Sequence, residues 1–434
     1  MLFRSETVGS RASEAAPHLL KMLDAPTAGT HMAALRGLAL LEDEAREVLP
    51  QLENYLHSER CVDVAATANL VVRLGGDRDR AARLLRERLL GEVPGHAYAP
   101  SLLRIDPEMA RGIVTLLTAR LESGTGNPRD DLNNLRHFGE AATPAVELAR
   151  RFLADRQGGY RTDGAMVLEA VGSAAAPALP DLIAVVREGV ELSGGTDRGE
   201  RTLEHWALGA LRNLGPLGES AWPTLVDRWL TLEPNPAPED TGDGLDARVL
   251  EAMAAVAPQE TRVRQCLRGA SLRGPQVLRP VACHGLLNGD APAAEDLALA
   301  REIVLDKEPS PRRGFLIDRL GRHAGGSVET IDTLMVLAEG EDYPLGDRLL
   351  ALESLGELGS GLSPWKDRLE ALQNRPFGRF PGPSRVAVEG PIYADRYKPA
   401  VRQRLALRNW LRFALVRLGN AEESNQSQRL EQLQ

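Results

Sequence analysis

Aromatic side chains and cysteines are scarce in this sequence of 434 residues. Phe, Trp and Tyr together make up 4% of it, and its three cysteines, Cys61, Cys266 and Cys283, stand far apart. A core with few aromatics, built from Leu, Ala and Val, suits close-packed helices and disfavours β-rich folds. Three widely spaced cysteines argue against a disulfide framework and favour a reducing compartment.

Long apolar runs and excess positive charge are missing too. No run reaches the roughly 18 apolar residues that span a bilayer, and the N-terminal MLFRSETVGS lacks the apolar core of a signal peptide. The formal net charge of −9 argues against a general affinity for nucleic acid or anionic membrane, because such partners attract a basic face. We therefore expect a cytoplasmic protein with no membrane partner, and nucleic-acid binding only if a local basic stripe exists.

Motifs for metals, nucleotides and nucleophiles are also lacking. The sequence has no H-E-x-x-H, no C-x-x-C, no phosphate-binding glycine loop with lysine and no G-x-S-x-G elbow. Adjacent helical residues point about 100° apart, so Cys283 and His284 are expected to be a packed cysteine beside a surface histidine. The calcium-like Asp240–Gly244 lacks the alternating ligands of an EF-hand loop. We expect no enzyme, no metal and no cofactor.

The sequence does have a recurring frame of Leu, three residues, Gly, four residues and Pro. It occurs at Leu135–Pro144, Leu168–Pro177, Leu214–Pro223 and Leu355–Pro364. We interpret the Leu as the end of a helix, the Gly as a left-handed turn at its C-cap, and the Pro as part of the first turn of the next helix. The predicted repeating unit is helix, tight turn, helix, and its sharpest copy is Leu168–Val186.

Helical pairs of this kind follow one another along residues 1–373, clearly from Ala12 onward. Residues 374–398 break the pattern with an irregular segment rich in Pro, Arg and aromatics. A terminal capping helix is predicted over 399–418 and a polar, flexible tail over 419–434. Because Met1–Arg11 is short and polar, the chain opens inside a repeat, and we expect it to be the C-terminal part of a longer protein or to have its true start upstream.

The frame followed by an apolar helix, as in GSAAAPALPDLIAVV and GEAATPAVELARRFL, resembles HEAT repeats, particularly the short bacterial kind grouped with phycobilisome-lyase-like HEAT repeats. Its spacing of 33 residues, from Pro17 to Pro50 and from Pro144 to Pro177, is below the roughly 40 to 47 of HEAT and armadillo units. The resemblance implies an all-α fold, a right-handed α-solenoid of about eleven stacked helical hairpins. It also implies that the second helices line a concave face that usually binds protein, without specifying the partner.

Arginines and tryptophans on the helical pairs have ordinary structural interpretations. Arginines of the second helices fall at different offsets from the motif proline, so they form no recognition ladder and fit solvated helix ends that complement the helix dipole; they are Arg150, Arg151, Arg187, Arg228 and Arg368. Tryptophans fit core packing; they are Trp206, Trp222, Trp229 and Trp365.

The irregular segment 374–398 is the candidate binding site. It combines aromatic residues with arginine, the types enriched at interface hot spots; the candidate residues are Phe377, Arg379, Phe380, Arg385, Tyr393 and Tyr397. The alternative is that the segment folds back and caps the open end of the array with its aromatics.

These patterns predict a non-catalytic protein-binding scaffold or adaptor that uses the concave face of a HEAT-like solenoid. The alternative is a regulatory or accessory module of an enzyme, either a lyase-type HEAT protein or a part whose catalytic domain lies upstream. The sequence leaves the identity of the protein partner and the oligomeric state open.

Overall fold

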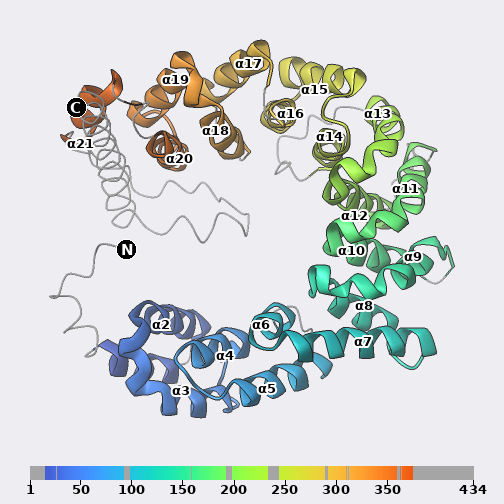
Figure 1. The fold of residues 1–434 in the computed structure, drawn as a ribbon, viewed down its shortest axis with the longest axis vertical. Helices are drawn as coiled ribbons and strands as arrows, with labels where there is room; N and C mark the ends of the chain where they lie inside the picture. Colours follow the sequence, from blue (N-terminus) through green and yellow to red (C-terminus); the bar gives the residue numbers. More distant parts are fainter. Residues whose placement is uncertain are drawn as a thin grey trace, which may run out of the picture. The chain divides into compact units, whose positions relative to one another are not determined.

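A computed structural model of the chain describes residues 15–25, 27–91, 98–157, 159–191, 198–232, 244–288, 292–308, 310, 312–358, 362 and 364–374. Every regular element within these ranges is an α or 3-10 helix (Figure 1). The all-α class predicted from the sequence is therefore confirmed. The predicted insertion beyond Asn374, the capping helix 399–418 and the tail lie outside the described residues.

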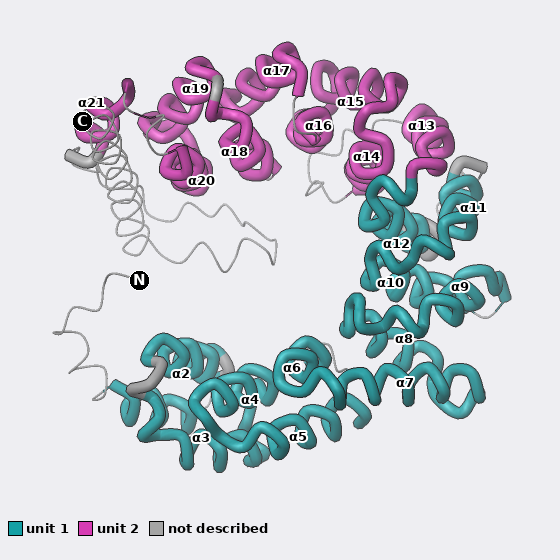
Figure 2. Tube along the Cα trace, in the orientation of Figure 1, with its two compact units in different colours: residues 1–218 teal, residues 219–434 magenta. Residues whose placement is uncertain are grey.

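The helices group into two compact units, residues 1–218 and 219–434 (Figure 2). Unit 1 contains α2 (Ala28–Leu41), α3 (Leu49–Leu56), α4 (Val64–Arg73), α5 (Arg78–Leu90), α6 (Tyr98–Ile105), α7 (Pro107–Ser123), α8 (Pro128–Arg136), α9 (Val146–Ala154), α10 (Arg161–Val171), α11 (Leu179–Glu191) and α12 (Arg198–Leu214). Unit 2 contains α13 (Trp222–Thr231), α14 (Leu245–Val256), α15 (Thr261–Arg273), α16 (Arg279–Leu286), α17 (Ala294–Leu305), α18 (Arg313–Arg322), α19 (Val328–Glu339), α20 (Leu345–Glu357) and α21 (Lys366–Asn374).

Within each unit the helices stack as two rows, which makes each unit a solenoid. The first helices of the predicted pairs carry even numbers and form the even row, and the second helices form the odd row (Figure 2). The core between the rows consists of Leu, Ala and Val, as the composition predicts; Leu168, Leu208 and Leu250 are fully buried. The right-handed sense of the superhelix stays a prediction.

The even row is the closely packed side of each unit. The helices α10 and α12, and likewise α18 and α20, contact each other extensively, whereas α9 and α11, or α15 and α17, touch at few points. A curved stack is narrowest on its inner side, and Figure 2 shows α14, α16, α18 and α20 on the inner side of unit 2. The expectation that second helices line the concave face is therefore wrong: the first helices do.

Some helices pack differently from the predicted pairs. A second helix contacts the first helix that follows it extensively in α9 with α10, α15 with α16 and α19 with α20, whereas α6 with α7 and α16 with α17 contact each other within the predicted pair. The predicted partners α10 and α11 instead meet mainly through a 3-10 helix, η4 (Gly172–Ala178). The frame at Leu168 thus marks a 3-10 crossover between α10 and α11 and not a tight turn.

This crossover depends on a glycine with positive φ. In the sharpest copy, α10 ends at Val171, Gly172 follows with φ of +64°, and Pro177 lies inside η4. The Leu135 copy repeats this geometry, with Gly139 at φ +55° starting η3 (Gly139–Ala145). The prediction of a left-handed glycine is confirmed at both positions. The motif proline, however, lies in the 3-10 helix and not in the first turn of the next α-helix.

The Leu214 copy is displaced by three residues relative to these two. Its glycine with positive φ is Gly215, with φ +55°, at the start of η5 (Gly215–Ala221). Pro223 then lies in the first turn of α13, the position that Pro180 takes in α11, which begins at Leu179. Copies with identical spacing in the sequence therefore take two different positions relative to the ends of their helices. In the fourth copy, Gly359 lies outside the described residues.

Arginines near the start of even helices bind the end of the preceding odd helix. Arg161 Nε donates to the carbonyl of Leu153 at 2.9 Å, and Arg279 Nε donates to that of Ser271 at 2.9 Å. Arg348 Nε donates to the carbonyl of Ala338 at 3.2 Å, and Arg313 Nη1 to that of Asp306. Carbonyls in the last turn of a helix lack intrahelical partners. These arginines therefore join the two helices of each hairpin.

One run, Arg161–Gly189, has the length and mean hydropathy, 1.3, of a helix able to cross a membrane. In the structure it is not one continuous α-helix, because α10 stops at Val171 and η4 separates it from α11. Its residues Val167, Leu168 and Val171 are fully buried in unit 1.

Replacing the crossover glycine should destabilise unit 1. Gly172 combines φ +64° with ψ −130°, a conformation that costs a side-chain-bearing residue about 1–3 kcal/mol, so Gly172→Ala should lower the free energy of unfolding by that amount. The matched control is Gly112→Ala in the middle of α7, where a Cβ meets open space and alanine should stabilise by about 1 kcal/mol. Urea denaturation of both variants measures the difference. Equal effects would contradict the assigned turn.

Candidate binding surface

Among the described residues, no group of three or more His, Cys, Asp or Glu side chains could hold a metal ion. Cys283 is fully buried, as predicted, and burial raises the pKa of its thiol. The binding residues predicted from the sequence lie outside the described residues and stay a prediction; they are Phe377, Arg379, Phe380, Arg385, Tyr393 and Tyr397. The described part of the chain offers other candidates, on its even row.

An aromatic and arginine cluster lies on the even row of unit 2; we call it the Phe315 cluster. Phe315 on α18 is 41% exposed, and the ring of His284 from α16 meets it edge-on with centroids 6.5 Å apart. The Arg312 guanidinium lies 5.8 Å from the Phe315 centroid. Arg312 Nη1 also forms an ion pair with Glu251 Oε1 of α14 at 2.9 Å. Three successive first helices thus contribute to one surface.

Arg319, the fifth member of the Phe315 cluster, is held by a neutral partner. Its Nη2 donates to the side-chain oxygen of Asn288, while its Nε is buried and has no hydrogen-bond partner within the described residues. Burial lowers the pKa of Arg319, the nearby Arg322 lowers it further, and Asp318 raises it. Arg319 forms no ion pair in the described part of the chain, so its positive charge is poorly compensated.

His284 is not the surface histidine predicted from the sequence. Burial lowers its pKa to about 4, and the charge of Arg319 acts in the same direction. Glu251 and Asp318 oppose this shift, and the carboxylates do not outweigh the burial. The imidazole is therefore neutral at physiological pH and packs as a half-buried ring against Phe315.

A second cluster lies on the even row of unit 1, around Trp206 of α12. The Arg136 guanidinium of α8 lies 6.0 Å from the Trp206 ring, and its Nη1 contacts Met166 Sδ of α10 at 2.8 Å. His205 meets Trp206 edge-on at 5.6 Å. Trp206 is half-buried beneath the arginine, a cation–π arrangement that leaves part of the ring accessible. Core packing, the interpretation made from the sequence, therefore describes Trp206 only in part.

Trp365 packs in the core, as predicted from the sequence. It is 7% exposed, and its Nε1 donates to Asp332 Oδ1 at 2.7 Å. Trp222 and Trp229 are half-buried.

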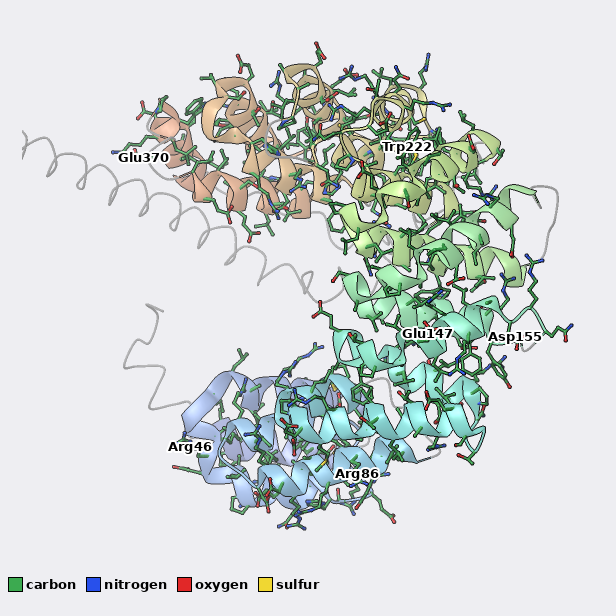
Figure 3. The ribbon with its side chains drawn as sticks, turned by 45° about the vertical axis from the view of Figure 1, so that its right-hand side comes forward. Arg46, Arg86, Glu147, Asp155, Trp222 and Glu370 are labelled. Atoms are coloured by element: carbon green, nitrogen blue, oxygen red, sulfur yellow. The ribbon has the colours of Figure 1, made fainter. Side chains whose placement is uncertain are left out.

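The odd row uses its arginines for structure. Arg150 Nε pairs with Asp181 Oδ2 at 2.8 Å, joining α9 to α11, and Arg368 pairs with both Asp332 and Glu339 of α19 at 2.8 and 2.9 Å. The prediction of solvated helix ends is wrong for Arg150 and Arg368, which tie neighbouring repeats together, whereas Arg187 is exposed, as predicted. Other charged residues of this row, such as the labelled Glu370 of α21, are exposed (Figure 3).

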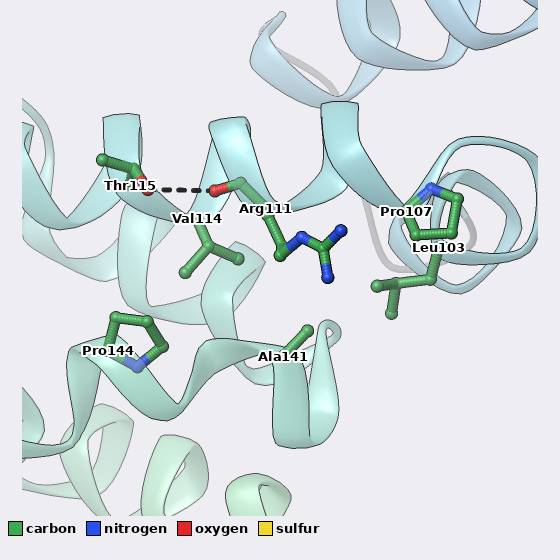
Figure 4. Close-up of a pocket in the computed structure, with 7 residues that line it drawn as sticks. All are labelled: Leu103, Pro107, Arg111, Val114, Thr115, Ala141 and Pro144. Atoms are coloured by element: carbon green, nitrogen blue, oxygen red, sulfur yellow. Dashed lines mark hydrogen bonds between the residues drawn. The ribbon is translucent and has the colours of Figure 1, made fainter.

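A cavity of about 360 Å³ lies in unit 1 beside α7 (Figure 4). It is lined by Leu103, Pro107, Arg111, Val114, Thr115, Ala141 and Pro144. Arg111 is paired with Glu108, and the Thr115 hydroxyl donates to the Arg111 carbonyl at 3.1 Å. The lining is thus mostly apolar and its polar groups are already partnered, so the cavity has no group free to orient a ligand.

No protein-family model and no curated protein matches the sequence. Among solved structures, an engineered protein aligns with 93% of this chain and 98% of its own length, at 16% identity and a TM-score of 0.36. Kap121p aligns with 94% of this chain at 12% identity and a TM-score of 0.36, and the chain spans about half of its length, 49%. Importin beta aligns with 94% at 12% identity and a TM-score of 0.38, and the chain spans 63% of its length. Likeness this low assigns no partner; the stacked helices themselves define an all-α solenoid.

Acid should destabilise unit 2 through His284. Its pKa is about 4 in the fold and about 6.5 in an unfolded chain, so the unfolded chain takes up the proton first as the pH falls. The stability from the neutral ring is therefore present above about pH 6.5 and lost by about pH 4, amounting to at most about 3 kcal/mol.

A non-titrating variant, His284→Gln, should flatten the fall in the free energy of unfolding between these pH values. Urea denaturation at stepped pH measures this slope. His18→Gln, at an exposed histidine, should keep the wild-type slope. A wild-type slope in His284→Gln would contradict the burial of this ring.

Proposed function

We propose that this chain is a non-catalytic scaffold that binds protein through the even row of its helices. The observation that carries the proposal is the Phe315 cluster, where an aromatic ring of α18 that is 41% exposed lies against Arg312. Aromatic and arginine side chains dominate the binding energy of protein interfaces. Such a pair on a packed helical row is a rigid anchor for a partner.

The Trp206 cluster supports the same proposal in unit 1. It presents another arginine over another aromatic ring, again from first helices. On the odd row, Arg150 and Arg368 are committed to ion pairs between neighbouring repeats. The even row is therefore the better contact surface in each unit.

A cytoplasmic location and a relation to short bacterial HEAT repeats are part of this proposal. The enzyme-accessory alternative differs from it only in that the partner would be a catalytic chain. Mass spectrometry of the captured protein decides between the two.

Variants of the even row should lose the partner. In affinity capture from native extract, Phe315→Ala and Trp206→Ala should each weaken retention of the co-purifying protein by about tenfold, because both remove a hot-spot aromatic. The controls are exposed apolar residues of the odd row: Val336→Ala on α19, at 41% the same exposure as Phe315, and Leu116→Ala on α7, at 40%, in the same unit as Trp206.

Both controls should retain the partner within about twofold. Circular dichroism and thermal unfolding of each variant separate loss of contact from loss of fold. Retention that falls with Val336→Ala or Leu116→Ala but survives Phe315→Ala and Trp206→Ala would place the contact surface on the odd row and overturn the proposal.

A further inference from the structure

The α18 residues of the Phe315 cluster lie on one face of that helix, together with Arg322; we call this the Phe315 face. Arg312, Phe315, Arg319 and Arg322 follow one another at steps of three, four and three residues, which places them on one side of a helix. Cationic groups therefore flank the exposed ring along the helix axis. The face combines an apolar centre with basic ends.

The charges of this face are unequally neutralised. Arg312 is paired with Glu251 at 2.9 Å, and Arg322 with Asp318 at 2.8 Å. Arg319 lies between them in sequence and has only the amide oxygen of Asn288 as a partner among the described residues. Its buried Nε keeps an unused donor. Arg319 is only partly buried, so a carboxylate arriving from outside would meet a guanidinium that no carboxylate of the described residues pairs with.

A partner that fits this face must supply two groups, one charged and one apolar. A carboxylate would meet the guanidinium of Arg319, and an apolar side chain one or two positions away would cover Phe315, one helical turn along α18. A short acidic protein segment interrupted by an apolar residue has this chemistry, whereas a basic segment would meet like charge. The face therefore selects by charge as well as by shape.

We propose that the Phe315 face of α18 binds an acidic, apolar-interrupted segment of a partner protein, with a carboxylate on Arg319 and an apolar side chain on Phe315. The proposal rests on the scaffold function proposed above and specifies the chemistry of the partner in unit 2. It assigns the face to a separate protein rather than to a second copy of this chain or to a nucleic acid.

Fluorescence anisotropy with the full chain tests this inference. The probe is a short fluorescein-labelled peptide of glutamates around one central leucine, and the comparison peptide carries glutamine in place of every glutamate. The acidic probe should bind more tightly than the glutamine peptide, and its binding should weaken as salt is raised. Equal binding of the two peptides would overturn the proposal.

Variants then locate the site. Arg319→Gln should weaken binding of the acidic probe about tenfold, because it removes a charge-assisted hydrogen bond, and Phe315→Ala should do so about tenfold by removing the apolar anchor. Arg319→Lys keeps the charge and should bind more tightly than Arg319→Gln. The matched control is Arg273→Gln at an exposed arginine of α15, which should change binding by less than about twofold.

Three other outcomes would overturn the proposal. These are tighter binding of a single-stranded oligonucleotide than of the acidic probe, a wild-type Kd in Arg319→Gln, and a dimer that dissociates in sedimentation when Arg319 is replaced. Failure of the probe while Phe315→Ala still loses the native partner would leave the scaffold function intact and reject only the acidic chemistry.

Discussion

Hydrogen bonds from arginine to the ends of odd helices hold four pairs of helices together in the described part of the chain. The last turn of a helix leaves carbonyl groups without partners, and Arg161, Arg279, Arg313 and Arg348 supply donors from the helix that follows. Each such bond fixes the start of an even helix against the end of the odd helix before it. In these pairs the two helices form a hairpin. A crossover through a 3-10 helix, such as η4, connects one hairpin to the next.

The way the helices pair determines which side chains stabilise the stack and which remain accessible. The odd row joins neighbouring repeats with ion pairs such as that of Arg150 with Asp181. The even row packs through its apolar side chains and leaves aromatic rings under arginine on its accessible side, at Trp206 and at Phe315. The proposed recognition surface therefore lies on the row opposite to these ion pairs within each unit.

Much of the helical organisation could be predicted from local signals. The succession of helices predicted from Ala12 to residue 373 is present in the described residues, because caps and breaks are encoded within a few residues of each helix. The pairing of helices could not be predicted, since a glycine followed by a proline is compatible with a tight turn or with a 3-10 crossover. Contacts between distant helices decide between the two.

The candidate surface could not be predicted from the sequence either, because it depends on contacts between distant helices. Phe315 and His284 are 31 residues apart, and the low pKa of His284 comes mainly from burial, which sequence does not display. The poorly compensated charge of Arg319 depends on which acids reach it, and Asp318 next to it in sequence pairs instead with Arg322. The one signal for this surface in the sequence was the spacing of three and four residues between Phe315 and the arginines on either side of it.

Hydrogen exchange of the full chain, measured by mass spectrometry with and without the captured partner, tests the central claim most directly. If the even row is the contact surface, amide exchange should slow in α16 and α18 on binding and stay unchanged in α15 and α17. Protection confined to α15 and α17 would contradict the account.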